Sequence, residues 1–174
     1  QRYQLSSSGF ERLNAFNSLS NGYVKISSKS GLIGNIYKFP KVTVTGTENI
    51  IMASVLARGI HVVKNISIEP EVIDLINFLN NSGAKIKFIG KRSLKIVGIR
   101  EFTNGTHKII GDRIEAFSYL CVAVITKGEI LVKNINPKFL DSEIKALKKL
   151  GCLIKLNKNS IYLKTKKKIE AHKH

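Results

Sequence analysis

Cysteine, acidic residues and long apolar runs are all scarce in this sequence. Only two cysteines are present, Cys121 and Cys152, too few for a disulfide framework and without the spacing of a metal site. Both lie in apolar segments, so we expect small buried residues and not reactive thiols. The lack of a disulfide pattern is typical of a reducing compartment, and we expect a cytoplasmic protein that holds no metal.

No apolar run approaches the ~20 residues that cross a bilayer, and residues 1–4 are too polar for a secretory signal. We therefore expect neither a membrane span nor a membrane partner. The first residue is not Met, which we interpret as a sign that the chain is a fragment or has been trimmed.

Acidic residues number 12 against 29 lysines and arginines, which gives a formal net charge of +17. A surface of this kind attracts anionic substrates and polyanions. The lysines are spread along the chain and are not interleaved with aromatic residues, as they are in nucleic-acid platforms. We expect no nucleic-acid partner. A basic non-enzymatic module for nucleic acid or another polyanion is the alternative function.

A series of strand, helix, strand, helix and hairpin recurs along the chain, which indicates a repeat architecture. The clearest copy covers residues 41–98, and a second covers about 112–165. A partial copy opens the chain, with a hairpin turn at Asn21-Gly22. In the first full copy we expect, in order, a strand over 42–44, a helix over 48–57, a strand over 60–64, a helix from residue 69 and a hairpin over 84–97.

Local signals mark where these helices begin. Thr45 and Glu48 have the spacing of a capping box, as do Asp112 and Glu115. The segment Glu69-Pro70-Glu71 places a proline and carboxylates in the first turn of a helix, where both are favoured.

Glycine and asparagine mark where the helices end. Gly59 and Gly83 are expected in the left-handed conformation that stops a helix, and Asn14 takes that role in the partial copy. Gly111 lies between the two full copies, where we expect a hinge. The helix over 48–57 is apolar nearly all round, so we expect it to be buried. These repeats alone would leave apolar helix faces without packing partners.

Several motifs in these copies carry a resemblance to a known family. They are Val42-Thr-Val-Thr-Gly-Thr-Glu-Asn49, Glu69-Pro-Glu71 with Asp74, Phe78-Leu-Asn80 with Gly83-Ala-Lys85, His107, and Asp112-Arg-Ile-Glu115. Together they resemble the UDP-N-acetylglucosamine 1-carboxyvinyltransferases, a family of enolpyruvyl transferases, over nearly the whole chain. The resemblance implies an α+β fold of repeated βαβαββ units, the inside-out α/β barrel, with helices inside and sheets outside.

The resemblance also implies how the chain is divided. Residues 1–110 would form the second half of the catalytic lobe, with a partial repeat over 1–38 and a full repeat over 41–98. Residues 112–168 would form the first repeat of the other lobe, and residues 169–174 would form a tail.

Members of this family transfer the enolpyruvyl group of phosphoenolpyruvate to the 3′-hydroxyl of UDP-N-acetylglucosamine in peptidoglycan synthesis, without a cofactor. The resemblance implies that Lys41, Val42, Thr43 and Val44 contact the nucleotide sugar. An ammonium group at Lys41 can pair with a diphosphate. Considered without the resemblance, Lys41 is one surface lysine among many.

Three further residues are candidates for a cleft or hinge, namely Glu69, Glu71 and Arg113. The alternative for the two glutamates is plain stabilisation of a helix N-terminus, which is the simpler explanation. The alternative for Arg113 is a solvated helix start.

The chain also departs from the family pattern. Gln4 stands where the family has an aspartate that contacts uridine. The resemblance places the catalytic cysteine loop and the general-base aspartate outside residues 1–174, so we expect the chain to be inactive alone. A different enzyme built on the same repeat is a further alternative, either the shikimate-pathway enolpyruvyl transferase or an RNA 3′-phosphate cyclase.

Overall fold

The computed structural model describes residues 8–165, and the chain divides into two compact units, residues 1–108 and 109–174. Each unit has its own hydrophobic core. Gln4 and the expected tail over 169–174 lie outside the described residues.

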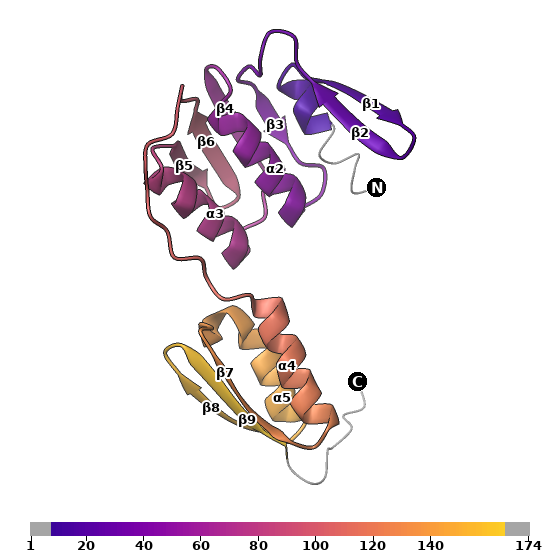
Figure 1. Cartoon of the computed structure of the whole chain (residues 1–174), viewed down its shortest axis with the longest axis vertical. Coiled ribbons are helices and arrows are strands. Elements are labelled where there is room, and N and C mark those ends of the chain that lie inside the picture. The colour runs from indigo at the N-terminus through magenta and orange to yellow at the C-terminus, as the bar shows by residue number, and fades with distance from the viewer. Residues whose placement is uncertain (1–7, 166–174) are drawn as a thin grey trace. The chain divides into compact units, whose positions relative to one another are not determined.

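The first unit is built on a four-stranded sheet with the strand order β3-β4-β6-β5. Its strands are β3 (Ile36–Lys38), β4 (Ile60–Lys64), β5 (Lys85–Gly90) and β6 (Ser93–Val97). Strands β3 and β4 run parallel, and the other neighbours are antiparallel. Helices α2 (Val44–Val55) and α3 (Pro70–Asn81) connect β3 to β4 and β4 to β5, and both cover one face of the sheet (Figure 1). The result is the expected βαβαββ order.

The core of this unit forms between the sheet and the two helices. Side chains alternate across a strand, so Val63, Leu94 and Ile96 all point toward the helices and are buried. Ile50 of α2 and Val72 of α3 face them and are also fully buried. Each such side chain stabilises the fold by roughly 1.5–3 kcal/mol through burial alone.

The strand predicted over residues 42–44 is wrong. These residues have high β propensity, but Thr43 caps α2 and Val44 is the first residue of that helix. The helix predicted over 48–57 therefore begins earlier and ends at Val55. The first strand of the unit is β3, which runs parallel to β4 and lies upstream of the predicted strand over residues 42–44.

The helix boundaries marked by Gly83, Asn14 and Pro70 are confirmed. Gly83 has a φ angle of +94° directly after the C-cap of α3, and Asn14 has a φ of +65°. Gly59 also has a positive φ, +90°, but α2 already ends at Val55, so the prediction that Gly59 ends this helix is wrong. Pro70 is the first residue of α3. A helix that ends with a residue of positive φ needs glycine or asparagine at that position, because few other residues tolerate this conformation. The sequence therefore predicts such helix ends.

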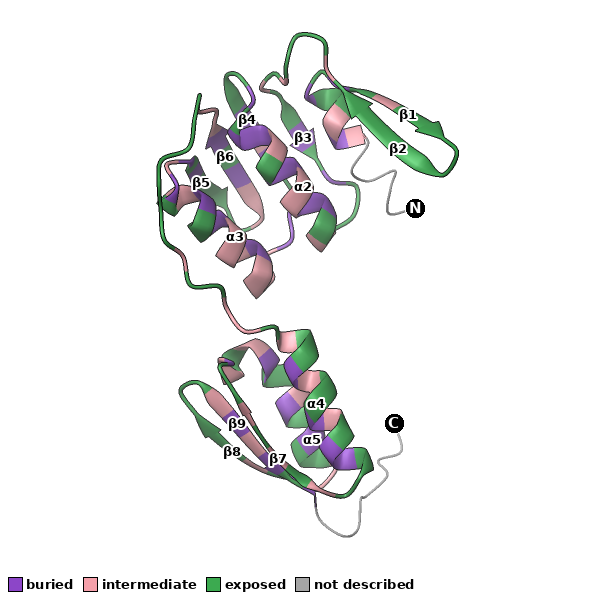
Figure 2. Cartoon of the chain, in the orientation of Figure 1, coloured by how far each residue is buried: buried purple, intermediate pink, exposed green. Residues whose placement is uncertain are grey.

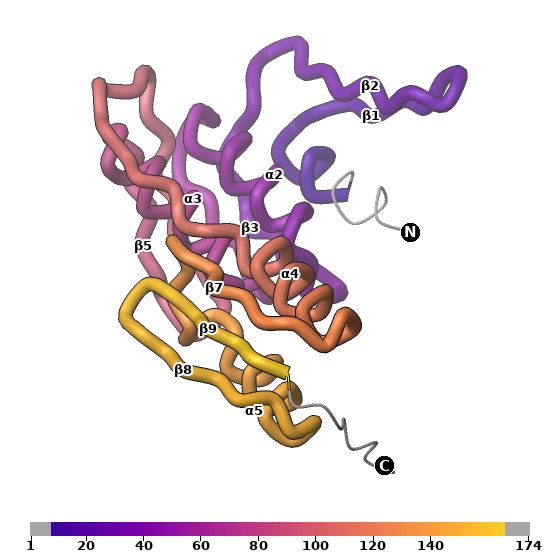
Figure 3. The backbone as a smooth tube through the Cα atoms, turned by 60° about the horizontal axis from the view of Figure 1, so that its bottom comes forward, coloured from indigo at the N-terminus to yellow at the C-terminus, as the bar shows by residue number. Residues whose placement is uncertain are grey.

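A hairpin precedes the four-stranded sheet. Its strands, β1 (Phe16–Ser20) and β2 (Tyr23–Ser27), are joined by Asn21 and Gly22, with φ angles of 50° and 79°. Positive φ at both central residues is what a two-residue turn between twisted strands requires, so the predicted hairpin is confirmed. Figure 3 shows that this ribbon extends away from the four-stranded sheet.

The second unit repeats the same plan with one strand fewer and with an additional short 3-10 helix. Its elements are α4 (Arg113–Ile125), β7 (Glu129–Lys133), the 3-10 helix η1 (Pro137–Leu140), α5 (Asp141–Lys149), β8 (Leu153–Asn157) and β9 (Ser160–Lys164). The strands form an antiparallel sheet with the order β7-β9-β8. Asn134 follows β7 with a φ of 60°, as Asn65 follows β4 with a φ of 57°.

Strand β7 occupies the place of β4, and nothing within residues 8–165 occupies the place of β3 beside it. The segment before α4 contains no strand there, although a strand precedes α2 in the first unit. One edge of β7 is therefore without a strand partner among the described residues.

Each of the labelled helices has exposed residues (Figure 2), and large apolar residues are among them. Met52 of α2 and Leu56, the C-cap of that helix, are exposed, so the expectation that this helix is buried is wrong. On α4 the exposed side chains include Val122 and Ile125, the latter 78% exposed. The expectation of unpacked helix faces is confirmed. None of the helices within residues 8–165 is both long enough and apolar enough to cross a membrane.

His61 points from β4 into the core and is completely buried. Neither ring nitrogen has a hydrogen-bond partner within the described residues. Burial lowers the pKa of His61, and the nearby carbonyl of Ala57 opposes this shift only in part. The imidazole is therefore held neutral in the folded chain.

We expect the chain to lose stability as the pH falls below 6.5. Unfolded His61 binds a proton near pH 6.5, whereas the buried ring resists protonation, so its contribution is complete above that pH and is lost as the pH falls. This site can account for a loss of at most about 2 kcal/mol between pH 7.5 and pH 5.0. Urea unfolding at the two pH values measures it. His61→Leu should reduce the difference, and an unchanged pH dependence in that variant would contradict the assignment.

Candidate functional site

The segment Lys41–Val44 covers the end of the loop before α2, the N-cap Thr43 and the first helical residue Val44. The side chains of Lys41 and Val42 are exposed, and those of Thr43 and Val44 are half-buried. Thr43 has an extended backbone, and its hydroxyl oxygen accepts a hydrogen bond from the Gly46 amide at 3.3 Å. The structure thus places all four predicted residues together at a helix N-terminus.

Thr47 stabilises the start of α2 through two hydrogen bonds of its side-chain hydroxyl. Its side chain is fully buried, and its hydroxyl donates to the Thr43 carbonyl at 2.6 Å. The same hydroxyl oxygen accepts from the Ser67 amide at 3.0 Å, which joins α2 to the loop before α3. The capping box predicted for Thr45 and Glu48 is wrong, because the cap is Thr43 and the internal brace is Thr47.

The start of α2 is suited to bind an anion. The amides of Val44 and Thr45 have no hydrogen-bond acceptor within the described part of the chain. These amides carry the positive end of the helix dipole. Lys41 lies exposed just before them, so a negative group placed here would meet two N–H donors and one ammonium group.

The starts of α2 and α3 lie at the same end of the sheet, because each helix follows one of the parallel strands β3 and β4. Glu69 is the residue before α3 and Glu71 lies in its first turn, both half-buried. Burial, and then the nearby charge of Glu71, raise the pKa of Glu48 in α2. Sequence reasoning missed Glu48 as a member of this group, because its spacing from Thr45 suggested a cap.

Arg113 belongs to the second unit, where it is the first residue of α4. The pKa of Glu143 is lowered mainly by the hydroxyl of Ser142, which donates to it at 2.7 Å, and in small part by the charge of Arg113. Asp112 caps α4 by accepting hydrogen bonds from the amides of Ile114 and Glu115, so the predicted cap at Asp112 is confirmed.

Gly111 is required by a close contact within the second unit. A Cβ atom at this position would lie 2.0 Å from the carbonyl oxygen of Asn134. Any side chain would force the two backbones apart. This contact explains the glycine without the hinge that its place between the copies suggested.

Three residues named in separate sequence motifs meet in the first unit. The Nε2 atom of His107 lies 2.9 Å from an oxygen of Asp74, and both side chains are nearly buried. The His107 ring also packs on Phe78, with centroids 5.6 Å apart. These contacts fasten the segment after β6 to α3.

Both cysteines of the chain are free thiols in the second unit. Cys152 is buried and burial raises the pKa of its thiol, whereas Cys121 is half-buried on α4. Within residues 8–165, no three His, Cys, Asp or Glu side chains are grouped so that they could hold a metal ion.

Comparison with known proteins gives the family. Residues 4–173 match the sequence profile of EPSP synthase (3-phosphoshikimate 1-carboxyvinyltransferase). The chain belongs to this carboxyvinyltransferase family. UDP-N-acetylglucosamine 1-carboxyvinyltransferase of Pelagibacter ubique (strain HTCC1062) is 44% identical over 149 residues, which are 86% of this chain and 36% of that protein. The protein of the same name in Endomicrobium trichonymphae is 43% identical over 152 residues, 87% of this chain and 36% of that protein.

The carboxyvinyltransferase resemblance inferred from the motifs is therefore confirmed, and the chain spans little more than a third of the length of these relatives. The enolpyruvyl transferase NikO from Streptomyces tendae matches with a TM-score of 0.74 and 15% identity, over 90% of this chain and 40% of that one. EPSP synthase from Acinetobacter baumannii matches with a TM-score of 0.65 and 18% identity, over 92% and 39%. Identities this low show the fold alone, and the predicted α+β fold is confirmed.

We expect Thr47→Val to destabilise the chain by about 1–3 kcal/mol, because the Ser67 amide would remain buried without an acceptor. Thr45→Val is the matched control at an exposed position of the same helix and should change the free energy of unfolding by less than about 0.5 kcal/mol. Urea unfolding measures both variants. A capping role for Thr45 predicts the opposite order, so an equal or larger loss at Thr45 would contradict the structure.

Proposed function

We propose that this chain is part of an enolpyruvyl transferase that moves the enolpyruvyl group of phosphoenolpyruvate to the 3′-hydroxyl of UDP-N-acetylglucosamine in peptidoglycan synthesis. A bond forms between the sugar oxygen and C2 of phosphoenolpyruvate, the bond from C2 to the phosphate oxygen breaks, and phosphate leaves. The main support is 44% identity over 149 residues to a protein named for this activity. We place the protein in the cytoplasm, because both substrates are charged and do not cross membranes unaided.

The nucleotide-sugar contact is proposed at Lys41, Val42, Thr43 and Val44. The Lys41 ammonium and the free amides of Val44 and Thr45 are suited to pair with a diphosphate. Exposed Val42 offers apolar contact area next to them.

Glu69 and Glu71 are proposed to face the substrates, together with Glu48, which shares their environment. Carboxylates accept hydrogen bonds from sugar hydroxyl groups. Arg113 stays a candidate for the hinge or for pairing with an anionic group. The alternative function, a basic module for nucleic acid, rests on net charge alone.

Titration of UDP-N-acetylglucosamine into the isotope-labelled chain should shift the amide signals of residues 41–45 in a saturable way. Lys41→Met should weaken the binding by about tenfold or more, since a charge-assisted hydrogen bond contributes roughly 1.5–3 kcal/mol. Lys91→Met, in the exposed turn between β5 and β6, is the matched control and should bind as the parent does. A well-dispersed spectrum without shifts would contradict the proposed contact.

With both substrates present, the chain alone should release no phosphate above background. The reason is that the family resemblance places the catalytic cysteine loop and the general-base aspartate outside residues 1–174. A colorimetric phosphate assay checks this. Steady release that depends on both substrates would overturn the proposal that the chain is inactive alone.

A further inference from the structure

The outer face of the four-stranded sheet, opposite α2 and α3, has an unusual composition. Five exposed lysines lie on it, and we call them the lysine face: Lys38, Lys64, Lys85, Lys87 and Lys95. They alternate along their strands with residues such as Tyr37, Val63, Ile86, Leu94 and Ile96, which are buried under the helices. The whole lysine face therefore points away from the core.

The positive charge of the lysine face is not compensated. The strand register places Lys38 beside Lys64 and Lys87 directly opposite Lys95. None of the five has an ion-pair partner in the part of the chain that the structure describes. Like charges directly opposite each other destabilise a sheet, so an anionic partner would relieve a repulsion built into the fold.

Aliphatic side chains separate these lysines, and we call them the aliphatic strip: Ile36, Ile60, Val62 and Val97. Ile36 is 61% exposed and Ile60 is 53% exposed. Ile60 pairs with Val97 across β4 and β6. The strip thus presents bare apolar surface between ammonium groups.

The second unit has different residues at the positions equivalent to Ile60 and Val97. The positions of Ile60 and Val97 correspond to Glu129 and Lys164, which form an ion pair at 3.1 Å. The Tyr162 hydroxyl donates to Glu129 at 2.8 Å. At this pair of positions the second unit carries an ion pair, whereas the first unit carries two apolar side chains.

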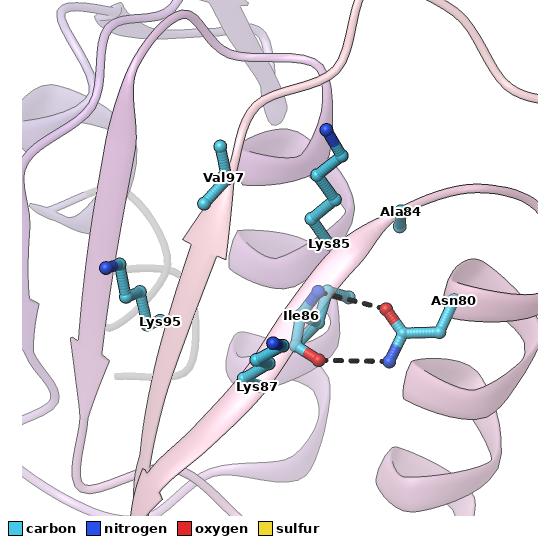
Figure 4. Close-up of a pocket in the computed structure, with 7 residues that line it drawn as sticks. All are labelled: Asn80, Ala84, Lys85, Ile86, Lys87, Lys95 and Val97. Atoms are coloured by element: carbon cyan, nitrogen blue, oxygen red, sulfur yellow. Dashed lines mark hydrogen bonds between the residues drawn. The ribbon is translucent and has the colours of Figure 1, made fainter.

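A hollow of about 440 Å³ lies beside β5 among Lys85, Lys87 and Lys95 (Figure 4). Asn80 also lines it, but its amide group already bonds the Ile86 amide at 2.9 Å and the Ile86 carbonyl at 3.0 Å. The charged side chains among its lining residues are the three lysines, so the hollow adds to the positive charge of the lysine face.

We propose that the lysine face docks on the anionic headgroups of a phospholipid surface, with lysines pairing to phosphates and the aliphatic strip reaching the acyl boundary. The expectation of no membrane partner rested on the lack of a spanning segment and of a secretory signal, and surface docking needs neither. A protein partner fits less well, since lysine is depleted from protein interfaces. Single-stranded nucleic acid also fits less well, since its sites stack bases on aromatic rings and the two sets contain none.

Sedimentation of the 174-residue chain with vesicles tests the proposal. Binding to phosphatidylcholine vesicles containing phosphatidylglycerol should be saturable and should weaken with salt, and pure phosphatidylcholine should bind little. A triple variant, Lys64→Gln with Lys87→Gln and Lys95→Gln, should bind about 100-fold more weakly, at roughly fivefold per lysine.

A matched control removes the same charge from the second unit, through Lys133→Gln, Lys155→Gln and Lys158→Gln. It should change binding by less than about threefold, because it leaves the lysine face intact. A charge-neutral variant, Ile60→Glu with Val97→Lys, copies the Glu129 and Lys164 pair and should weaken binding several-fold. Circular dichroism melting confirms that each variant is folded.

Three results would overturn the proposal. The first is no binding to anionic vesicles by the folded parent chain. The second is equal loss in both triple variants, which would mean attraction by net charge alone. The third is binding to a short RNA that the lysine-face triple variant abolishes while vesicles are not bound, which would assign the face to nucleic acid.

Discussion

Burial of one sheet face under two helices is the constraint on which the rest of the first unit depends. Because strand residues alternate, the register that buries Val63 and Ile96 also places Lys64 and Lys95 on the opposite face. A slip of one residue would exchange the two sets and bury the lysines, so the hydrophobic face fixes the register. The parallel pairing of β3 and β4 then brings the starts of α2 and α3 to one end of the sheet.

That common end concentrates opposing electrostatic effects. Helix N-termini favour negative charge, by about 0.3–1 kcal/mol at exposed positions. Glu48 lies beyond the first turn of α2, and burial and then the charge of Glu71 raise its pKa. In the second unit, Asp112 accepts two amide hydrogen bonds at the start of α4, and that end is satisfied by its own cap. The end formed by α2 and α3 keeps two free amides and is the better anion site of the two.

The two units show which features the repeat needs and which can vary. In both units the residue directly after the strand β4 or β7 is an asparagine in the left-handed region, Asn65 or Asn134. Both end a helix with a left-handed glycine, Gly83 and Gly151. The outer faces of the two sheets differ, because residues on these faces do not pack in the core and can change without loss of core burial.

The α+β class came from the resemblance of the sequence motifs to a known family. The sequence by itself also determined the repeat, the hairpin at Asn21-Gly22 and the helix end at Gly83. These rest on local sterics, since few residues tolerate positive φ, and on the period of the apolar pattern. It also placed Lys41–Val44 together, because they are neighbours in the chain. The sequence misjudged the secondary structure of that segment, since β propensity at Val42–Val44 is weaker than the cap and the brace supplied by Thr43 and Thr47. Only the tertiary structure decided that Glu48 and Glu71 share an environment, that His107 meets Asp74 and Phe78, and that five lysines share a face. Such groupings depend on strand register and helix packing between residues far apart in the chain, which no local pattern encodes.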